Sequence, residues 1–225
     1  MATQVIPPEF SDALKAFVLL EDQVAAKFVQ AIESAAPTLL VSTLAEKVAG
    51  ISGLEKGQAR DFLMMFGSMS RSRSSSEKNV ESFLKSVRQS AIDAGVISAN
   101  EMEAHWPKAA KHLAAVLNAP AIQIAAKALA VMTSNERMLC TARVVSDIRP
   151  IFSDDLEPTA CVILHQLKLS FHEQGDYDNV AETFVAVDYD HLRTLQKAID
   201  RALKKHGKLK AMAAAMNLRV LSPEE

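Results

Sequence analysis

The sequence predicts an α+β protein, in which an N-terminal all-α helical bundle is followed by a small C-terminal β-β-β-α domain. Two observations support this fold class. Through residue 135, apolar side chains recur every three or four positions, whereas after Cys140 they alternate at every second position. The first spacing is typical of a helix and the second of a strand. We therefore expect a helical domain over 1–138, a β-β-β-α dimerisation domain over 139–210 and a polar tail over 211–225.

About six amphipathic helices with short connections are expected in the first part. The first carries one apolar stripe that begins at Phe10 and continues to Ile32, before Pro37 closes the segment. Gly50 is expected to end the second helix. Ser98 with Glu101 three residues later is a capping-box pattern, which predicts the start of the fifth helix. The expected ranges of the other helices are 38–48, 55–69, 80–94 and 120–134.

A polar stretch, "SRSRSSS" at 70–76, separates the third and fourth helices. Its composition favours a flexible connector. The alternative is a phosphorylation target or a nucleic-acid contact, with Arg71 and Arg73 pairing to phosphate.

Three strands and a helix are expected after Cys140. The strands are predicted at 142–152, 161–171 and 180–187, with turns at "SDDLEP" and at "HEQGDYDN", where Gly175 supplies backbone freedom. Asp188 is a predicted N-cap for the last helix, which we expect to end at Gly207. This helix can cover only one face of a three-stranded sheet. The other face therefore needs a partner, either the helical domain or a second copy of the chain.

The C-terminal region, over about 140–208, resembles the COMM domain. The matching segments are the "SDIRPIF" strand, the long "CVILHQLKLSF" strand, the "ETFVAVDYDHL" junction and the Leu-patterned helix after it. The family carries a Trp in its first strand where this chain has Ile148, and Pro150 indicates an edge strand or a bulge there. The resemblance implies an obligate dimer of interlocked β-β-β-α units that serves as a scaffold. A β-β-β-α domain of another family is the alternative.

The composition of the chain limits the kinds of partner and environment that we expect for it. The net charge is −2, with 14 basic and 14 acidic residues through Cys140 and 11 basic and 13 acidic residues after it, so no broad basic face for nucleic acid is expected. The longest uncharged apolar stretch, 113–126, is too short and too polar to span a bilayer. Cys140 and Cys161 lack CxxC spacing and are expected to be reduced thiols in a cytoplasmic protein.

The sequence contains no pattern that names a reaction. Gly-rich phosphate loops, a GxSxG elbow and HExxH or HxH spacings are all absent. Asp147, Asp154, Asp155 and Glu157 suit a solvated turn better than a cation site. The six histidines include His165, which we expect to be a hydrogen-bonded core or interface residue. A metal-dependent enzyme built on the histidines and the acidic turn is a weaker alternative.

We therefore expect a non-enzymatic scaffold protein that binds other proteins and forms a homodimer or higher oligomer through its C-terminal domain. No cofactor and no membrane insertion are expected. A nucleic-acid-binding regulator that uses the helical domain is the alternative function. The residues predicted for the interface are apolar and belong to the strands: Ile148, Phe152, Ile163, Leu167, Leu169, Phe171, Phe184 and Val187.

Overall fold

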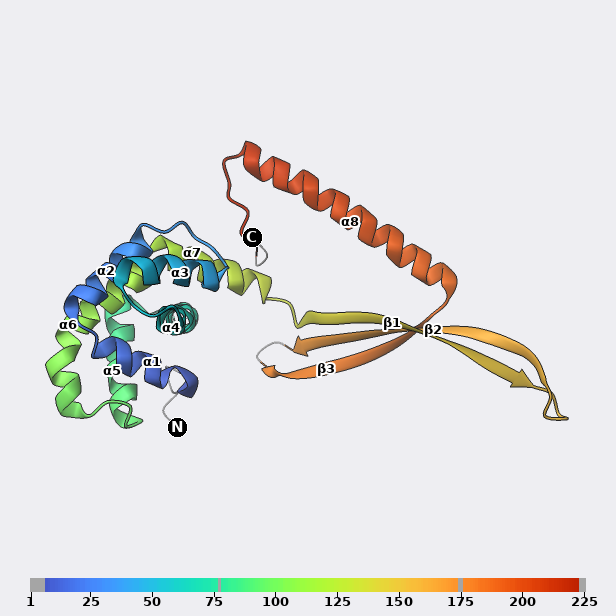
Figure 1. Cartoon of the computed structure of the whole chain (residues 1–225), viewed down its shortest axis with the longest axis horizontal. Coiled ribbons are helices and arrows are strands. Elements are labelled where there is room, and N and C mark those ends of the chain that lie inside the picture. The colour runs from blue at the N-terminus through green and yellow to red at the C-terminus, as the bar shows by residue number, and fades with distance from the viewer. Residues whose placement is uncertain (1–6, 77, 174–175, 223–225) are drawn as a thin grey trace. The chain divides into compact units, whose positions relative to one another are not determined.

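The computed structural model describes residues 7–76, 78–173 and 176–222 (Figure 1). The chain divides into two compact units, with the boundary between Val131 and Met132. The first unit is helical, and the second contains a three-stranded antiparallel sheet followed by a long helix. The predicted α+β class and the order β-β-β-α are confirmed.

Among the described residues, the helical unit contains a short 3-10 helix and seven α-helices. Each contributes residues to, or packs against, one apolar core. The elements are η1 (Pro8–Phe10), α1 (Ser11–Val18), α2 (Asp22–Glu33), α3 (Val41–Ser52), α4 (Lys56–Ser75), α5 (Val80–Asp93), α6 (Ala99–Asn118) and α7 (Pro120–Met132).

The first predicted helix is divided into η1, α1 and α2, so the expectation of one continuous stripe was wrong. The reason lies in the aromatic core. The ring centroids of Phe17 and Phe28 are 5.7 Å apart, whereas residues eleven positions apart on a straight helix are separated by about 16 Å. The chain must therefore turn between these residues. Both rings also pack edge-on against Phe62 of α4, which is completely buried.

Helix α3 ends at Ser52, with Gly53 as its C-cap, and not at the predicted Gly50. Gly53 adopts a left-handed backbone conformation (φ 79°), and its N–H donates to the carbonyl oxygen of Ala49 at 2.9 Å. This is a glycine C-cap, which requires a positive φ that glycine adopts without steric cost. Gly50 keeps a helical conformation, so it does not end the helix.

Helix α4 continues through "SRSRSSS" to Ser75, which contradicts the predicted flexible connector. Ser70 is buried, so the core-facing stripe extends into this segment. The hydroxyl of Ser74 donates to the carbonyl oxygen of Ser70 at 2.9 Å. The hydroxyl thus shares the carbonyl oxygen that already accepts the helical N–H bond, a contact that leaves the helix continuous although it slightly weakens it.

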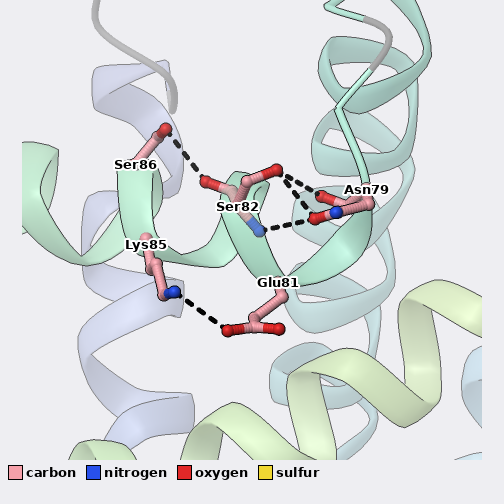
Figure 2. A network of polar contacts seen from close by, with 5 residues as sticks. All are labelled: Asn79, Glu81, Ser82, Lys85 and Ser86. Atoms are coloured by element: carbon pink, nitrogen blue, oxygen red, sulfur yellow. Dashed lines mark hydrogen bonds and ion pairs between the residues drawn. The ribbon is translucent and has the colours of Figure 1, made fainter.

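Helix α5 begins with a side-chain cap that was not among the predicted features. The side chain of Asn79 accepts a hydrogen bond from the backbone N–H of Ser82 at 2.8 Å, and the Ser82 hydroxyl also donates to Asn79 (Figure 2). Lys85 forms an ion pair with Glu81 at 2.9 Å, and this contact lowers the pKa of the Glu81 carboxyl. These contacts fix the first turn of α5 after a charged loop.

The capping box predicted at Ser98 is present at the start of α6. The Ser98 side chain accepts from the backbone N–H of Glu101, and the Glu101 carboxylate accepts from the backbone N–H of Ser98, each at 3.3 Å. Pro107 lies inside this helix.

The second unit contains β1 (Arg137–Phe152), β2 (Pro158–Glu173), β3 (Asp176–Val187) and α8 (Tyr189–Ala215), in strand order β1-β2-β3. Strand β1 is therefore an edge strand, which explains how it accommodates Pro150. The turn predicted at "HEQGDYDN" is shorter than expected, because β2 continues to Glu173 and β3 begins at Asp176. Gln174 and Gly175 lie outside the described residues.

Helix α8 is longer than predicted. Its N-cap is Asp188, as expected, but the helix passes through Gly207 and ends at Ala215, so 211–215 are not part of a polar tail. The sequence "AMAAAM" after Lys210 explains the difference. Alanine has the highest helix propensity, and several alanines outweigh the roughly 1 kcal/mol that one interior glycine costs.

Candidate interface

The register of the strands determines which side chains share a face of the sheet. Strand β2 pairs with β1 so that Ile163 lies opposite Ile148 and Leu167 opposite Val144. On the other side of β2, Val185 of β3 lies opposite Leu167. Because directly opposed residues point to the same side, these apolar side chains form one face. We call it the apolar face; its members are Ala142, Val144, Ile148, Ile163, Leu167, Leu169, Val185 and Val187.

Helix α8 runs along part of the apolar face without closing onto it. Leu192, Leu195 and Ile199 of the helix line a cavity of about 540 Å³ whose other wall is the sheet. The sheet residues that line it are Leu139, Ala142, Arg143, Val144, Leu167 and Leu169. A protein interior leaves few voids larger than a water molecule. This cavity is therefore a groove between the helix and the sheet, and it is not a packed core.

The apolar face continues past the end of β3. Val187 is opposite His165, so the part of β2 before His165 pairs only with β1. Figure 1 shows this two-stranded ribbon running beyond the point where α8 begins. We call residues 147–164 the hairpin arm. Ile148 and Ile163 face each other there with 69% and 62% of their surfaces exposed. An isolated two-stranded hairpin is marginally stable, and no third strand of the described chain pairs with this part of the sheet.

The opposite face of the sheet is more polar. Lys168 forms an ion pair with Glu182 at 2.6 Å, and its ammonium lies 5.5 Å from the centre of the Phe184 ring. The ion pair lowers the pKa of Glu182. Val145 and Phe184 are large apolar groups on this face, and both remain about half exposed. Phe184 is thus partly covered by its own strand neighbours.

The structure brings six of the eight predicted interface residues to one side of the sheet. Ile148 and Ile163 lie on the hairpin arm, Leu167 and Leu169 line the groove, and Val187 ends β3. Phe171 continues the alternation of β2 but is already buried, with the Arg137 guanidinium 4.8 Å from its ring centre. The other two are apart from this group: Phe152 lies at the far end of β1 and Phe184 on the opposite face.

The list of predicted residues missed the contribution of the last helix. Leu195 and Ile199 are exposed and line the groove together with Val144 of β1. These residues could have been found from the sequence. Leu195 and Ile199 belong to the apolar stripe of α8, and the period of two places Val144 on the same face of β1 as Ile148. What the sequence did not show is that α8 stands off from the sheet. Its stripe is therefore available to a partner.

The residues considered for catalysis or metal binding do not gather. In the described part of the chain, no three His, Cys, Asp or Glu side chains lie close enough together to hold a metal ion. His165 contacts the hydroxyl of Ser146 at 2.7 Å, which confirms the expected hydrogen bond. His112 contacts Asp22 at 2.9 Å and lowers the pKa of that carboxyl. Asp147 lies within β1, away from the acidic turn.

Both cysteines are exposed free thiols on the strands. Cys161 is opposite Pro150 in the register of the hairpin arm, while Cys140 lies at an irregularity in β1. No single helix among the described residues has the length and apolar character needed to cross a membrane. Helices α6 and α7 pass that test only as a pair, bent by 56°.

No family model matches the chain, and no curated protein matches it in sequence. The resemblance of the C-terminal unit to the COMM domain therefore stays a prediction. The function proposed below depends on the geometry of that unit.

Proposed function

We propose that this protein is a non-enzymatic scaffold that homodimerises through its C-terminal unit and presents its helical unit to other proteins. One observation carries the proposal: the C-terminal unit has almost no interior of its own. Of its described residues, only Ser170 and Phe171 are buried, and α8 has no buried residue.

The exposed surface has the composition of an interface. Ile148 and Ile163 are directly opposed and mostly exposed, and Val144, about half exposed, lies on the same face beyond the Ser146–His165 pair. Exposed apolar surface of this kind, with polar groups beside it, marks protein interaction sites. Removing apolar surface from water stabilises an association by about 25 cal/mol for each square ångström, before the entropy of association is subtracted.

A second copy of the chain is the partner that fits this surface. The apolar face, the groove and the stripe of α8 lie on the same unit. A two-fold axis would bring these surfaces of one copy against the same surfaces of a second copy, so that each covers the other. The β-β-β-α order supports the same proposal through the resemblance to the COMM domain, which implies interlocked dimers. A helix of 27 residues with an uncovered stripe also gains most of its stability from packing.

The proposal predicts that Ile163→Asp abolishes self-association of the full-length chain. A carboxylate at this position would be buried without a partner in the dimer, which is strongly unfavourable. The measurement is co-purification of two differently tagged copies expressed together. The matched control is Met64→Asp, which places the same charge on an exposed apolar position of α4 in the helical unit.

We expect the two tagged copies of the wild-type chain to co-purify, and likewise the two copies of Met64→Asp, whereas purification of one Ile163→Asp copy through its tag should lose the other copy. Circular dichroism should show the same helix content in all three proteins. Co-purification of the two Ile163→Asp copies, with both copies folded, would contradict the proposal.

A further inference from the structure

Helix α8 carries a second apolar stripe that is separate from the groove. Leu192, Leu195 and Ile199 line the groove, whereas Leu209, Met212 and Met216 lie roughly 100° further round the helix axis. The three residues of the second stripe are 51–60% exposed, and none of them lines the groove. One flat partner therefore cannot cover both stripes.

The second stripe is accompanied by positive charge. Residues 201–222 contain six basic residues and no acidic residue. Helical spacing places Arg201, Lys205 and Lys208 on the side of the helix that Leu209 and Met212 occupy. All three cations are exposed and none forms a salt bridge with another described residue. We call this surface the basic stripe; its members are Arg201, Lys205, Lys208, Leu209, Met212 and Met216.

The tip of the hairpin arm has the complementary composition. Asp154, Asp155 and Glu157 surround Leu156, whose side chain is 80% exposed. The turn is closed by a hydrogen bond from the Leu156 N–H to the Ser153 carbonyl oxygen at 3.0 Å. We call residues 154–157 the acidic tip.

Leu156 is held in an unfavourable backbone conformation. Its φ is 62°, in the left-handed region where hairpins of this kind favour glycine. The turn itself has no use for a leucine there, because the side chain projects into solvent. A large apolar side chain kept at a position that disfavours it indicates a role outside the turn.

We propose that the acidic tip of one copy docks on the basic stripe of a second copy, with Leu156 against Leu209, Met212 and Met216 and the three carboxylates against the three cations. This inference rests on the proposed function, because it requires that two copies meet. It goes further by naming the two segments of the chain that contact each other outside the apolar face. Each copy has one tip and one stripe, so a two-fold dimer makes the contact twice.

The contact cannot form within one copy. Helix α8 begins at the end of β3 and runs over the part of the sheet that lies away from the arm, because its first turns line the groove beside Leu139 and Leu169. The tip lies about 23 Å beyond the end of β3 by strand geometry. Leu209 lies about 30 Å along the helix in the other direction. The two surfaces are therefore on the order of 50 Å apart in a single chain.

A reciprocal charge reversal tests the docking. The tip variant is Asp154→Lys with Asp155→Lys, and the stripe variant is Lys205→Glu with Lys208→Glu, each in the full-length chain. The dissociation constant of the dimer is measured by sedimentation velocity over a dilution series. We expect each variant alone to weaken the dimer by about tenfold or more, because like charges then face each other.

A heterodimer of the two variants restores both contacts, because each tip then faces a stripe of opposite charge, and a protein that carries all four changes restores them in a single homodimer. In it the charges are opposite again, and we expect a dissociation constant within about threefold of the wild-type value. The control Glu103→Lys alters an exposed carboxylate of α6 and should leave the constant unchanged.

Leu156→Gly provides a second test that does not change charge. Glycine accepts the positive φ, so this variant should fold at least as well as the wild type while losing the docking side chain. We expect an unchanged or higher melting temperature at high dilution and a dimer that is several-fold weaker.

The outcomes separate the two proposals. A wild-type chain that is monomeric overturns the proposed function and this inference together. A wild-type dimer whose dissociation constant is unaffected by the reversals, or is not restored by the four changes, overturns only the docking. As a further control, binding to phosphatidylserine vesicles is compared between the wild-type chain and the stripe variant. If the lysine reversals abolish vesicle binding but leave the dimer intact, the basic stripe serves a lipid surface and the docking is wrong.

Discussion

At the scale of single residues, the capping box at the start of α6 is the feature that the sequence predicted most directly. Its pattern is local, because it depends only on Ser98 and on the residue three positions later. Asn79 caps α5 in a similar way and was missed, since Asn79 stands in a polar segment that offered several candidate caps. Local chemistry can thus be predicted where one candidate stands alone.

Glu101 gives a prediction for the dependence of stability on pH. The Ser98 hydroxyl donates to its carboxylate at 2.7 Å, and this bond, with the one from the Ser98 backbone N–H, lowers the pKa of Glu101 below its ordinary value of 4.5. A lowered pKa in the folded state means that the ionised carboxylate favours folding. Its contribution is present above pH 4.5 and is lost as the pH falls through the lower, folded-state pKa.

We therefore expect Glu101→Gln to unfold at lower urea concentration than the wild type at pH 7, and the difference to shrink as the pH falls below 4.5 through the lowered, folded-state pKa of Glu101. Urea denaturation followed by circular dichroism measures this. Glu103→Gln is the matched control, since Glu103 is exposed on the same helix. A difference between Glu101→Gln and the wild type that persists in acid would show that the effect is not electrostatic.

At the scale of elements, helix ends were predicted less well than helix positions. Gly50 and Gly207 both looked like helix stops, yet both lie inside helices, whereas Gly53 is the true C-cap of α3. The difference is a matter of backbone conformation, which composition does not reveal. A glycine ends a helix only where the chain needs a positive φ.

This contrast predicts opposite effects of the same substitution. Gly207→Ala should raise the free energy of unfolding by about 1 kcal/mol, because the added Cβ meets no atom within 4 Å and alanine favours the helix. Gly53→Ala should lower it by about 1 kcal/mol, because φ is 79° there. Urea denaturation at one fixed protein concentration tests both. Equal signs for the two variants would contradict the assignment of their roles.

The break between α1 and α2 shows why the periodicity of apolar residues does not predict tertiary packing. The apolar spacing from Phe10 to Ile32 is continuous, so the pattern predicts one helix. The contact between the rings of Phe17 and Phe28 requires a turn, and this is a long-range condition that periodicity does not contain.

At the scale of the whole molecule, the sequence predicted the two-part organisation and the faces of the sheet. The change of apolar period after Cys140 was sufficient for both, because period 2 assigns alternate residues to opposite faces. The distance between α8 and the sheet was not predictable. It depends on what fills the groove, and the filler we propose belongs to another copy.

The central claim is that a second copy covers the apolar face, the groove and the hairpin arm. Sedimentation equilibrium of the full-length chain at micromolar concentration tests it most directly. We predict a mass of twice the 24.5 kDa of one chain. A mass that stays at 24.5 kDa throughout the micromolar range would contradict the claim.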